Sequence, residues 1–350
     1  MLPFEMPRIG RRASGPRDLI SDVAGVTVGH HTIADGDVQT GVTVIRPHAG
    51  DPYRDKVPAA SVIINGHTKA MGLTQLDELG LFETPIALTN TLCVGAVGMA
   101  QVREAIRTNP RICRGTGSCN PLVFECSDAL LSDIQQLTIT DEHYLAALAD
   151  ARADFECGAV GAGRGMVNFG LKGGVGSASR IARADEREYT VGALVLSNYG
   201  KPHQLIVAGQ RIGEMLQDAA ERDRRPETGS IIVILATDAP LEHRQLRRLA
   251  QRATAGLART GSVFGHGSGD AVVAFTTSHT VRYAIEGEST GALRPPLAYL
   301  YDTALDPEFF EAAADATEQA ILKAIYRAET VVGFQGAERL SLVDALRRLA

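Results

Sequence analysis

The sequence lacks the features that mark several large classes of protein. No apolar stretch reaches the ~18 residues that a membrane span needs, and the basic N-terminus lacks the apolar run of a secretory signal. There is no block of Lys or Arg, and the formal net charge is -6 at pH 7. These absences argue against membranes and nucleic acid as partners and favour a cytoplasmic protein.

Cysteine and histidine show no metal-binding pattern. The five cysteines are odd in number, with no CxxC pair and no zinc-ligand spacing. Reduced thiols in a cytoplasmic protein are the simplest account of them. The nine histidines contain no HExxH motif, and the adjacent His30 and His31 would point to opposite faces of a strand. We therefore expect no metal site.

The glycine-rich segments also lack the common nucleotide and esterase motifs. In segment 161–180, Asn168 occupies the third glycine slot of GxGxxG, and no GxxxxGK[ST] loop is present. In "GHGSGD" (265–270), His266 stands where the nucleophile elbow GxSxG requires glycine. Glycines that merely allow turns are an equal alternative for any one such loop.

What the sequence does contain is material for a large core. The 350 residues are 45% hydrophobic and 22% charged, as in a globular protein of one large domain or two smaller ones. Strand-like segments occupy 26–32, 41–47, 61–66, 84–91, 189–198, 230–239 and 271–277. Helix-like segments occupy 92–107, 142–152, 241–258 and 307–327. Their irregular alternation favours sheets covered by helices over a βαβ repeat.

Ser268 stands between a helix-like run and a strand-like run, with glycine on both sides. Gly267 lets the preceding peptide adopt the strained geometry in which the serine hydroxyl attacks its carbonyl. Once that bond is cut, Ser268 is N-terminal, and its own α-amine, with a pKa of ~7.7–8, can act as base for its hydroxyl. The pattern predicts a self-activated nucleophile. A Ser-His-Asp triad stays an alternative, although no local motif identifies its histidine.

Landmarks along the chain resemble those of the DmpA-type peptidases, the family of L-aminopeptidase/D-esterases and β-aminopeptidases. They are "LISDVAGVTVGHHT", "TGVTVIRP", "LGLFETPIALTNTLCVGAVG", "GAVGAGRGM", "LKGGVGSASR", "VGALVLSNYG", "ATDAPL", "ARTGS", "HGSGD" and "AETVVGFQG". The resemblance covers about residues 17 to 345 and is specific in order and spacing. It implies an α+β fold, the αββα sandwich of the DmpA/ornithine-acetyltransferase type, as one domain over residues 1–350.

The resemblance also implies self-processing and an activity. The precursor would be cut into an α chain (1–267) and a β chain (268–350) that stay together in a homo-oligomer, without metal or organic cofactor. The processed enzyme would hydrolyse amide or ester bonds of small aminoacyl or short-peptide substrates, as an aminopeptidase does. The alternatives are a relative that only binds a small ligand, and an acyltransferase that uses the same serine.

Several residues match positions of the family's site. Gly267 and Ser268 form the cleavage site, with Ser268 as nucleophile. Asp238 falls where better-known members use Asn as an oxyanion donor, although an ionised Asp can only accept. Lys172 matches an active-site lysine of the nylon-oligomer branch. Phe169 falls where some members carry a catalytic tyrosine.

Further site residues follow from the same resemblance. Asn198 is expected with Phe169 in the substrate-binding set, and the loop 65–72 either lines the pocket or is a turn without contact to substrate.

An acidic pair is expected beside the nucleophile. Asp306 and Glu308 lie at about the right sequence distance, and Asp302 and Glu318 compete because the preceding loop varies in length. A plain helix cap is an equal alternative for Asp306 and Glu308.

Overall fold

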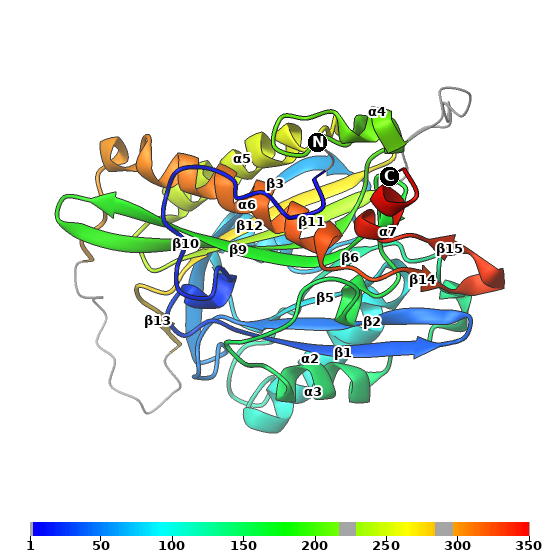
Figure 1. The fold of residues 1–350 in the computed structure, drawn as a ribbon. Coiled ribbons are helices and arrows are strands. Elements are labelled where there is room, and N and C mark those ends of the chain that lie inside the picture. The colour runs from blue at the N-terminus through cyan, green and yellow to red at the C-terminus, as the bar shows by residue number, and fades with distance from the viewer. Residues whose placement is uncertain (1–2, 217–228, 284–296, 350) are drawn as a thin grey trace.

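The structure, a computed structural model, describes residues 3–216, 229–283 and 297–349. Its elements stack in four layers: two helices, a large sheet, a smaller sheet and two further helices (Figure 1). The expected αββα sandwich is therefore confirmed. Within the described ranges, every helix is too short or too polar to cross a lipid bilayer.

The large sheet has seven strands, one of which, β4 (Leu81–Phe82), pairs beside β3. The others follow in the order β13 (Val281–Arg282), β3 (Asp55–Gly66), β12 (Gly269–Thr276), β11 (Ser230–Thr237), β10 (Arg187–Asn198) and β9 (Gly174–Ala184). β11 and β12 are parallel, and the other neighbours are antiparallel. β12 is therefore a central strand, bonded on both sides.

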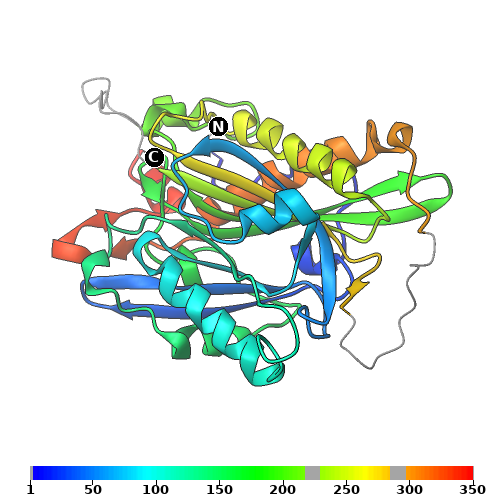
Figure 2. The same cartoon turned by 180° about the vertical axis from the view of Figure 1, so that it is seen from behind.

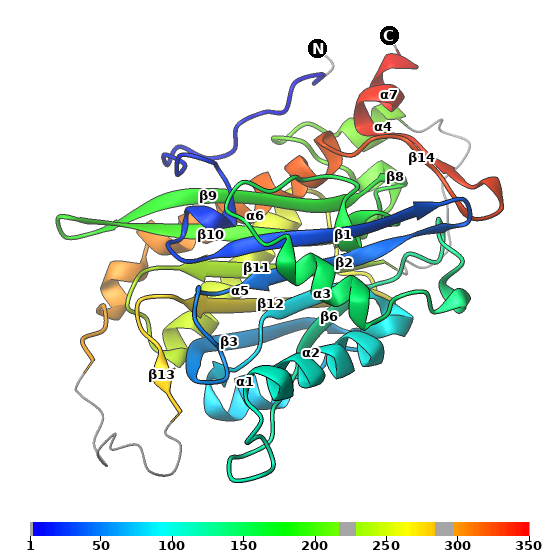
Figure 3. The same ribbon diagram turned by 90° about the horizontal axis from the view of Figure 1, so that it is seen from below.

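The smaller sheet packs against the inner face of the large one. Its strands are β1 (Thr27–Asp35), β2 (Val38–Arg46), β5 (Ile86–Asn90) and β6 (Leu122–Cys126). Apolar side chains from both sheets form one cluster that includes Ile45, Leu88, Phe124, Leu196 and Ile232. Seen from below, the strands of the two sheets lie over one another (Figure 3). This cluster excludes water between the sheets.

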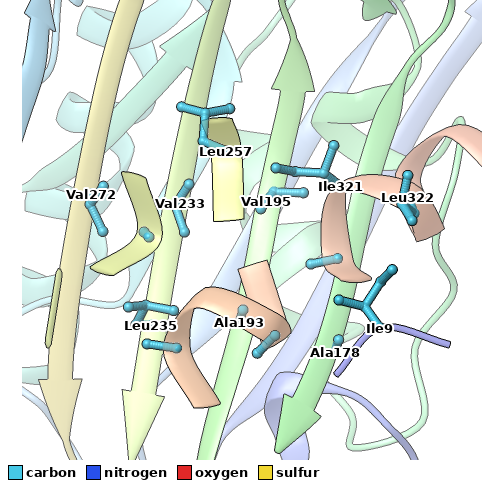
Figure 4. Packing of buried hydrophobic residues seen from close by; sticks show 14 of the residues in the cluster. Ile9, Ala178, Ala193, Val195, Val233, Leu235, Leu257, Val272, Ile321 and Leu322 are labelled. Atoms are coloured by element: carbon cyan, nitrogen blue, oxygen red, sulfur yellow. The ribbon is translucent and has the colours of Figure 1, made fainter. Parts of the chain in front are cut away.

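Helices cover both outer faces. α5 (His243–Arg259) and α6 (Glu308–Tyr326) pack on the large sheet. Figure 4 shows this packing through Val195, Val233, Val272, Leu257, Ile321 and Leu322. α2 (Val94–Thr108) and α3 (Asp141–Ala149) cover the smaller sheet, as the view from behind shows for α2 (Figure 2). The remaining short elements are α1 (Leu73–Leu79), α4 (Ile212–Leu216), α7 (Leu342–Arg347), β7 (Val167–Asn168), β8 (Leu171–Lys172), β14 (Val331–Val332) and β15 (Glu338–Arg339).

Every segment expected to be a strand or a helix is one, with ends shifted by up to three residues, except that β3 begins at Asp55, six residues before its expected start. The glycine-rich segment 161–180 conceals a long strand, β9, which the sequence patterns missed. A Cβ on Gly176 would lie 1.9 Å from the carbonyl oxygen of Ala320 on α6. The glycine therefore allows α6 to pack directly on the strand, a different purpose from a phosphate-binding loop.

Candidate active site

Ser268 directly precedes β12 and ends a tight turn. Its N–H donates to the carbonyl of Gly265 at 2.9 Å, which closes the turn over His266 and Gly267. The side-chain amide of Asn65, on β3, donates to the same carbonyl at 2.5 Å. These two bonds fix the Gly267–Ser268 peptide at one end of the large sheet.

The hydroxyl of Ser268 is buried and has a defined partner. Its Oγ donates to Oδ1 of Asp270 at 2.6 Å, and both residues are 1% exposed. The N–H of Ile231 donates to the same carboxylate oxygen at 3.2 Å. Sequence reasoning missed Asp270, although a signal existed: residues i and i+2 of a strand share a face, and Asp270 is the i+2 residue.

Asn198 lies in line with the nucleophile across the sheet. The strand register pairs Asn198 with Ser230, and Ser230 with Gly269. Oδ1 of Asn198 accepts the N–H of Val167 at 2.8 Å, which fixes the orientation of the amide. Its Nδ2 group donates to no residue in the described part of the chain. Asn198 thus offers a hydrogen-bond donor at the same sheet end as Ser268, about two strand spacings from it, or ~10 Å.

The loop after β3 lies against the nucleophile. A Cβ on Gly269 would lie 2.6 Å from the backbone nitrogen of Thr68, so only glycine fits beneath this loop. The ring of His67 meets the ring of His266 edge-on, with 5.4 Å between their centroids. Loop 65–72 therefore lies beside Ser268, and whether it contacts substrate stays a prediction.

Cys126 lies close by but is not a rival nucleophile. Its thiol contacts the carbonyls of Ser230 at 3.5 Å and Leu196 at 3.6 Å. Burial raises the pKa of Cys126 well above its ordinary value. The thiol is therefore protonated, and a protonated thiol is a poor nucleophile. All five cysteines are free.

Lys172 is fully buried, and its amino group is hydrogen-bonded to backbone carbonyls. Its Nζ contacts the carbonyl oxygens of Gly163 at 2.9 Å, Met166 at 2.9 Å and Gly173 at 2.8 Å. Burial also lowers the pKa of Lys172 well below its ordinary value. These contacts hold together the loop that carries β7 and β8. The catalytic role expected for Lys172 stays a prediction.

Phe169 lies in the hydrophobic core, next to the segment that follows Asn198. Its ring packs edge-on against Tyr199 with 5.0 Å between centroids, and it is 1% exposed. Its N–H donates to the carbonyl of Tyr199 at 2.8 Å. A Cβ on Gly200 would lie 2.3 Å from the ring. The ring is therefore covered and packs against the segment that follows Asn198, and the substrate-binding role expected for Phe169 stays a prediction.

Asp238 lies at the opposite end of the sheet from Ser268. β11 and β12 run parallel with Ser230 opposite Gly269, so Asp238, eight residues further along the chain, is about 26 Å away at ~3.3 Å per residue. Its Oδ1 accepts the N–H of Thr190 at 2.8 Å, and burial raises its pKa. The expectation that Asp238 faces the oxyanion is wrong.

Glu308 also lies at that far end. Its carboxylate forms an ion pair with the guanidinium of Arg12 at 2.5 Å and accepts a hydrogen bond from the N–H of Arg183 at 2.9 Å. Burial alone would raise the pKa of Glu308, but the Arg183 N–H and the Arg12 guanidinium outweigh burial and lower it. A place beside the nucleophile is therefore wrong for Glu308.

The other acidic candidates are engaged elsewhere too. Asp302 pairs with Arg244 at 2.8 Å, near the first residue of α5. Asp306 belongs to the same far end, two residues before Glu308, and it does not cap α6, because the N-cap is Pro307 without a side-chain bond. Glu318 lies 3.5 Å from Arg259 in the outer helical layer. The expected acidic pair is therefore not at Ser268.

Comparisons with known proteins identify the family of this chain. The model of the family described as Peptidase family S58 matches residues 18–339. Over 368 residues the chain is 36% identical to the Beta-peptidyl aminopeptidase BapA of Sphingosinicella microcystinivorans, covering 96% of this chain and 90% of that protein. A solved structure of the PH0078 protein from Pyrococcus horikoshii OT3 is 42% identical, with a TM-score of 0.91, over 100% of this chain and 98% of that one.

A third match defines the class of fold. The L-aminopeptidase D-Ala-esterase/amidase of Ochrobactrum anthropi is 31% identical with a TM-score of 0.89, covering 99% of this chain and 96% of that one. Its structure is described as a prototype for the serine aminopeptidases and a new variant among the Ntn hydrolase fold. This chain belongs to peptidase family S58. It is accordingly a hydrolase of the aminopeptidase type, as its sequence motifs implied.

The buried carboxyl group of Asp128 generates a prediction on pH. Asp128 follows β6 and is fully buried, and burial raises its pKa from 3.8 to about 7, although Thr40 and Asn90 partly oppose the shift. A raised carboxyl pKa means that the folded state favours the protonated form. Stability from this group is therefore present below pH ~4 and is lost as the pH rises towards 7.

The substitution Asp128→Asn should remove this loss. It should raise the free energy of unfolding above pH 7 by up to ~4 kcal/mol and change it little at pH 4. Urea unfolding of both proteins across this pH range measures the difference. Equal stability of the two proteins at pH 8 would contradict the raised pKa.

Proposed function

We propose that the chain is a single-domain precursor (1–350) that cuts itself between Gly267 and Ser268 into an α chain (1–267) and a β chain (268–350). The observation that carries the proposal is Ser268 at the start of a central strand, held in a turn with glycine on either side and with its hydroxyl buried and hydrogen-bonded. After cleavage, the hydrogen bonds of β12 to β3 and β11 would keep the new terminus in place.

The freed Ser268 hydrolyses an amide. Its neutral α-amine accepts the proton from Oγ while Oγ attacks the substrate carbonyl carbon. The side-chain amide of Asn198 donates to the oxyanion that forms, since its Nδ2 is a donor at this sheet end without a partner among the described residues. The ammonium then returns the proton to the leaving amine as the carbon–nitrogen bond breaks. Water hydrolyses the Ser268 ester and regenerates the hydroxyl.

The substrate is the N-terminal residue of a short peptide or a small aminoacyl amide. Support comes from the relatives, one named a β-peptidyl aminopeptidase and another an L-aminopeptidase and D-Ala-esterase/amidase. A panel of L-, D- and β-aminoacyl p-nitroanilides separates these substrate classes. Ligand binding without turnover would favour the alternative of a binding protein, and transfer of the acyl group to an added amine would favour the acyltransferase.

The processed pair forms a homo-oligomer in the cytoplasm. The five free cysteines support the location. An exposed apolar stripe supports the assembly. It comprises Leu92, in the short turn just before the outer helix α2, and Met99 and Ile106 on α2 itself. These residues recur every seven positions, and each is more than 40% exposed. Light scattering should return a multiple of the 37.2 kDa unit. A mass of one unit would contradict the assembly.

Self-processing has a direct test. On a denaturing gel, the purified protein should show two fragments, and Edman sequencing of the smaller should begin Ser-Gly-Asp-Ala. The variant Ser268→Ala should fold, stay full length and release no amine, because the only change is the loss of one hydroxyl. An active enzyme that runs as one 37.2 kDa band would contradict the proposal.

Asn198 and Asp238 give a matched contrast at the two ends of the sheet. Asn198→Asp keeps the acceptor for the Val167 N–H but removes the donor, so kcat per processed chain should fall by ~10²–10³ with little change in KM. Asp238→Asn and Glu308→Gln should leave kcat and the pH–rate profile unchanged, because both residues lie at the far end. Steady-state kinetics of the three variants decide this, and a severe loss in Asp238→Asn would contradict the assignment.

A further inference from the structure

Self-cleavage raises a question of chemistry that the mature mechanism does not answer. In the processed enzyme, the base for the Ser268 hydroxyl is its own α-amine. In the precursor that nitrogen belongs to the Gly267–Ser268 amide, whose lone pair is delocalised and not basic. The precursor therefore needs a different group to accept the hydroxyl proton.

One carboxylate is in contact with that hydroxyl. Oγ of Ser268 donates to Oδ1 of Asp270 at 2.6 Å, the length of a charge-assisted O–H···O⁻ bond. No other titratable side chain within the described ranges makes a hydrogen bond to this Oγ. His67 and His266 lie nearby, but they are exposed and meet each other ring to ring.

The carboxylate is held in position by the sheet. Asp270 is the second residue of β12 and lies on the same face as Ser268. The Ile231 N–H of the neighbouring strand donates to Oδ1 at 3.2 Å, so this oxygen is fixed by the backbone of β11. Its burial, at 1% exposure, keeps water from competing for the hydroxyl proton.

We infer that Asp270 is the general base of the self-cleavage step. The inference rests on the proposed self-processing and names its missing catalytic residue. Oδ1 takes the proton from Oγ as Oγ bonds to the Gly267 carbonyl carbon. The tetrahedral intermediate then breaks its bond to the Ser268 nitrogen, and that nitrogen receives the proton back from Asp270. The product is an ester between Gly267 and Oγ with a free α-amine. Water hydrolyses the ester to the Gly267 carboxylate and the Ser268 hydroxyl.

The test follows the cleavage of newly made full-length chain. Wild type and variants are synthesised in a cell-free system with labelled methionine, and the decay of the precursor is followed on denaturing gels. Asp270→Asn keeps an oxygen for both the Ser268 hydroxyl and the Ile231 N–H but is not basic. Its cleavage should be ~10²–10⁴-fold slower than that of wild type, the range that general-base catalysis contributes.

Chemical rescue separates a base from a merely structural residue. Asp270→Ala leaves a space of carboxylate size next to Oγ, and added formate should restore part of its cleavage rate. Formate should not restore cleavage of Ser268→Ala, which lacks the nucleophile. Asp128→Asn is the matched control, because it also neutralises a buried acid but one without a hydrogen bond to Ser268, and it should cleave at the wild-type rate. Circular dichroism and thermal unfolding establish that each variant is folded.

The outcomes are distinct. Slow cleavage of folded Asp270→Asn, together with formate rescue of Asp270→Ala, supports the inference. Cleavage of Asp270→Asn at the wild-type rate, or a slow Asp270→Ala that formate does not accelerate, overturns the role of Asp270 while wild-type cleavage still upholds the proposed function. A wild-type chain that never cleaves overturns both.

Discussion

The pairing of β12 between β3 and β11 is the constraint on which the site depends. Hydrogen bonds on both edges hold the strand at its first residue, Gly269, so the position of Ser268 is set by the sheet and needs no flexible loop. The strand register also places Asn198 opposite Ser230, and Ser230 opposite Gly269, so that Asn198 lies at the same end of the sheet as Ser268. A nucleophile that becomes a chain end would otherwise fray. Here the sheet that is the core of the fold also keeps the new terminus fixed.

The two stages of the proposed chemistry make different demands on one serine. Before cleavage its nitrogen is an amide, and Asp270 is the group in contact with the hydroxyl. After cleavage the nitrogen is an amine that can serve as base. The turn from Gly265 to Ser268, held by Asn65, presents the bond to be cut. Cys126 lies near this turn, and its thiol contacts the backbone carbonyls of Ser230 and Leu196.

The sequence predicted the elements and the nucleophile better than the partners of the nucleophile. Apolar periodicity identified the strands and helices, and glycine on both sides of a serine pointed to Ser268. The strand β9 was missed because its glycines, of which Gly176 packs against α6 and Gly174 against Gly158, hide the apolar pattern. Asp238 was placed by a motif match and Glu308 by its sequence distance from Ser268, and neither shows at which end of a sheet a residue lies. That information is in the strand register, which decides that Asn198 is near the nucleophile and Asp238 is far from it.

The central claim is that the chain becomes an enzyme by cutting the bond before Ser268. Intact-mass spectrometry of the denatured, active protein tests this most directly. The account predicts two chains, residues 1–267 and 268–350, whose masses add up to that of the precursor plus one water. A single chain with the mass of the unprocessed precursor, found in a preparation that releases amines at full rate, would contradict it.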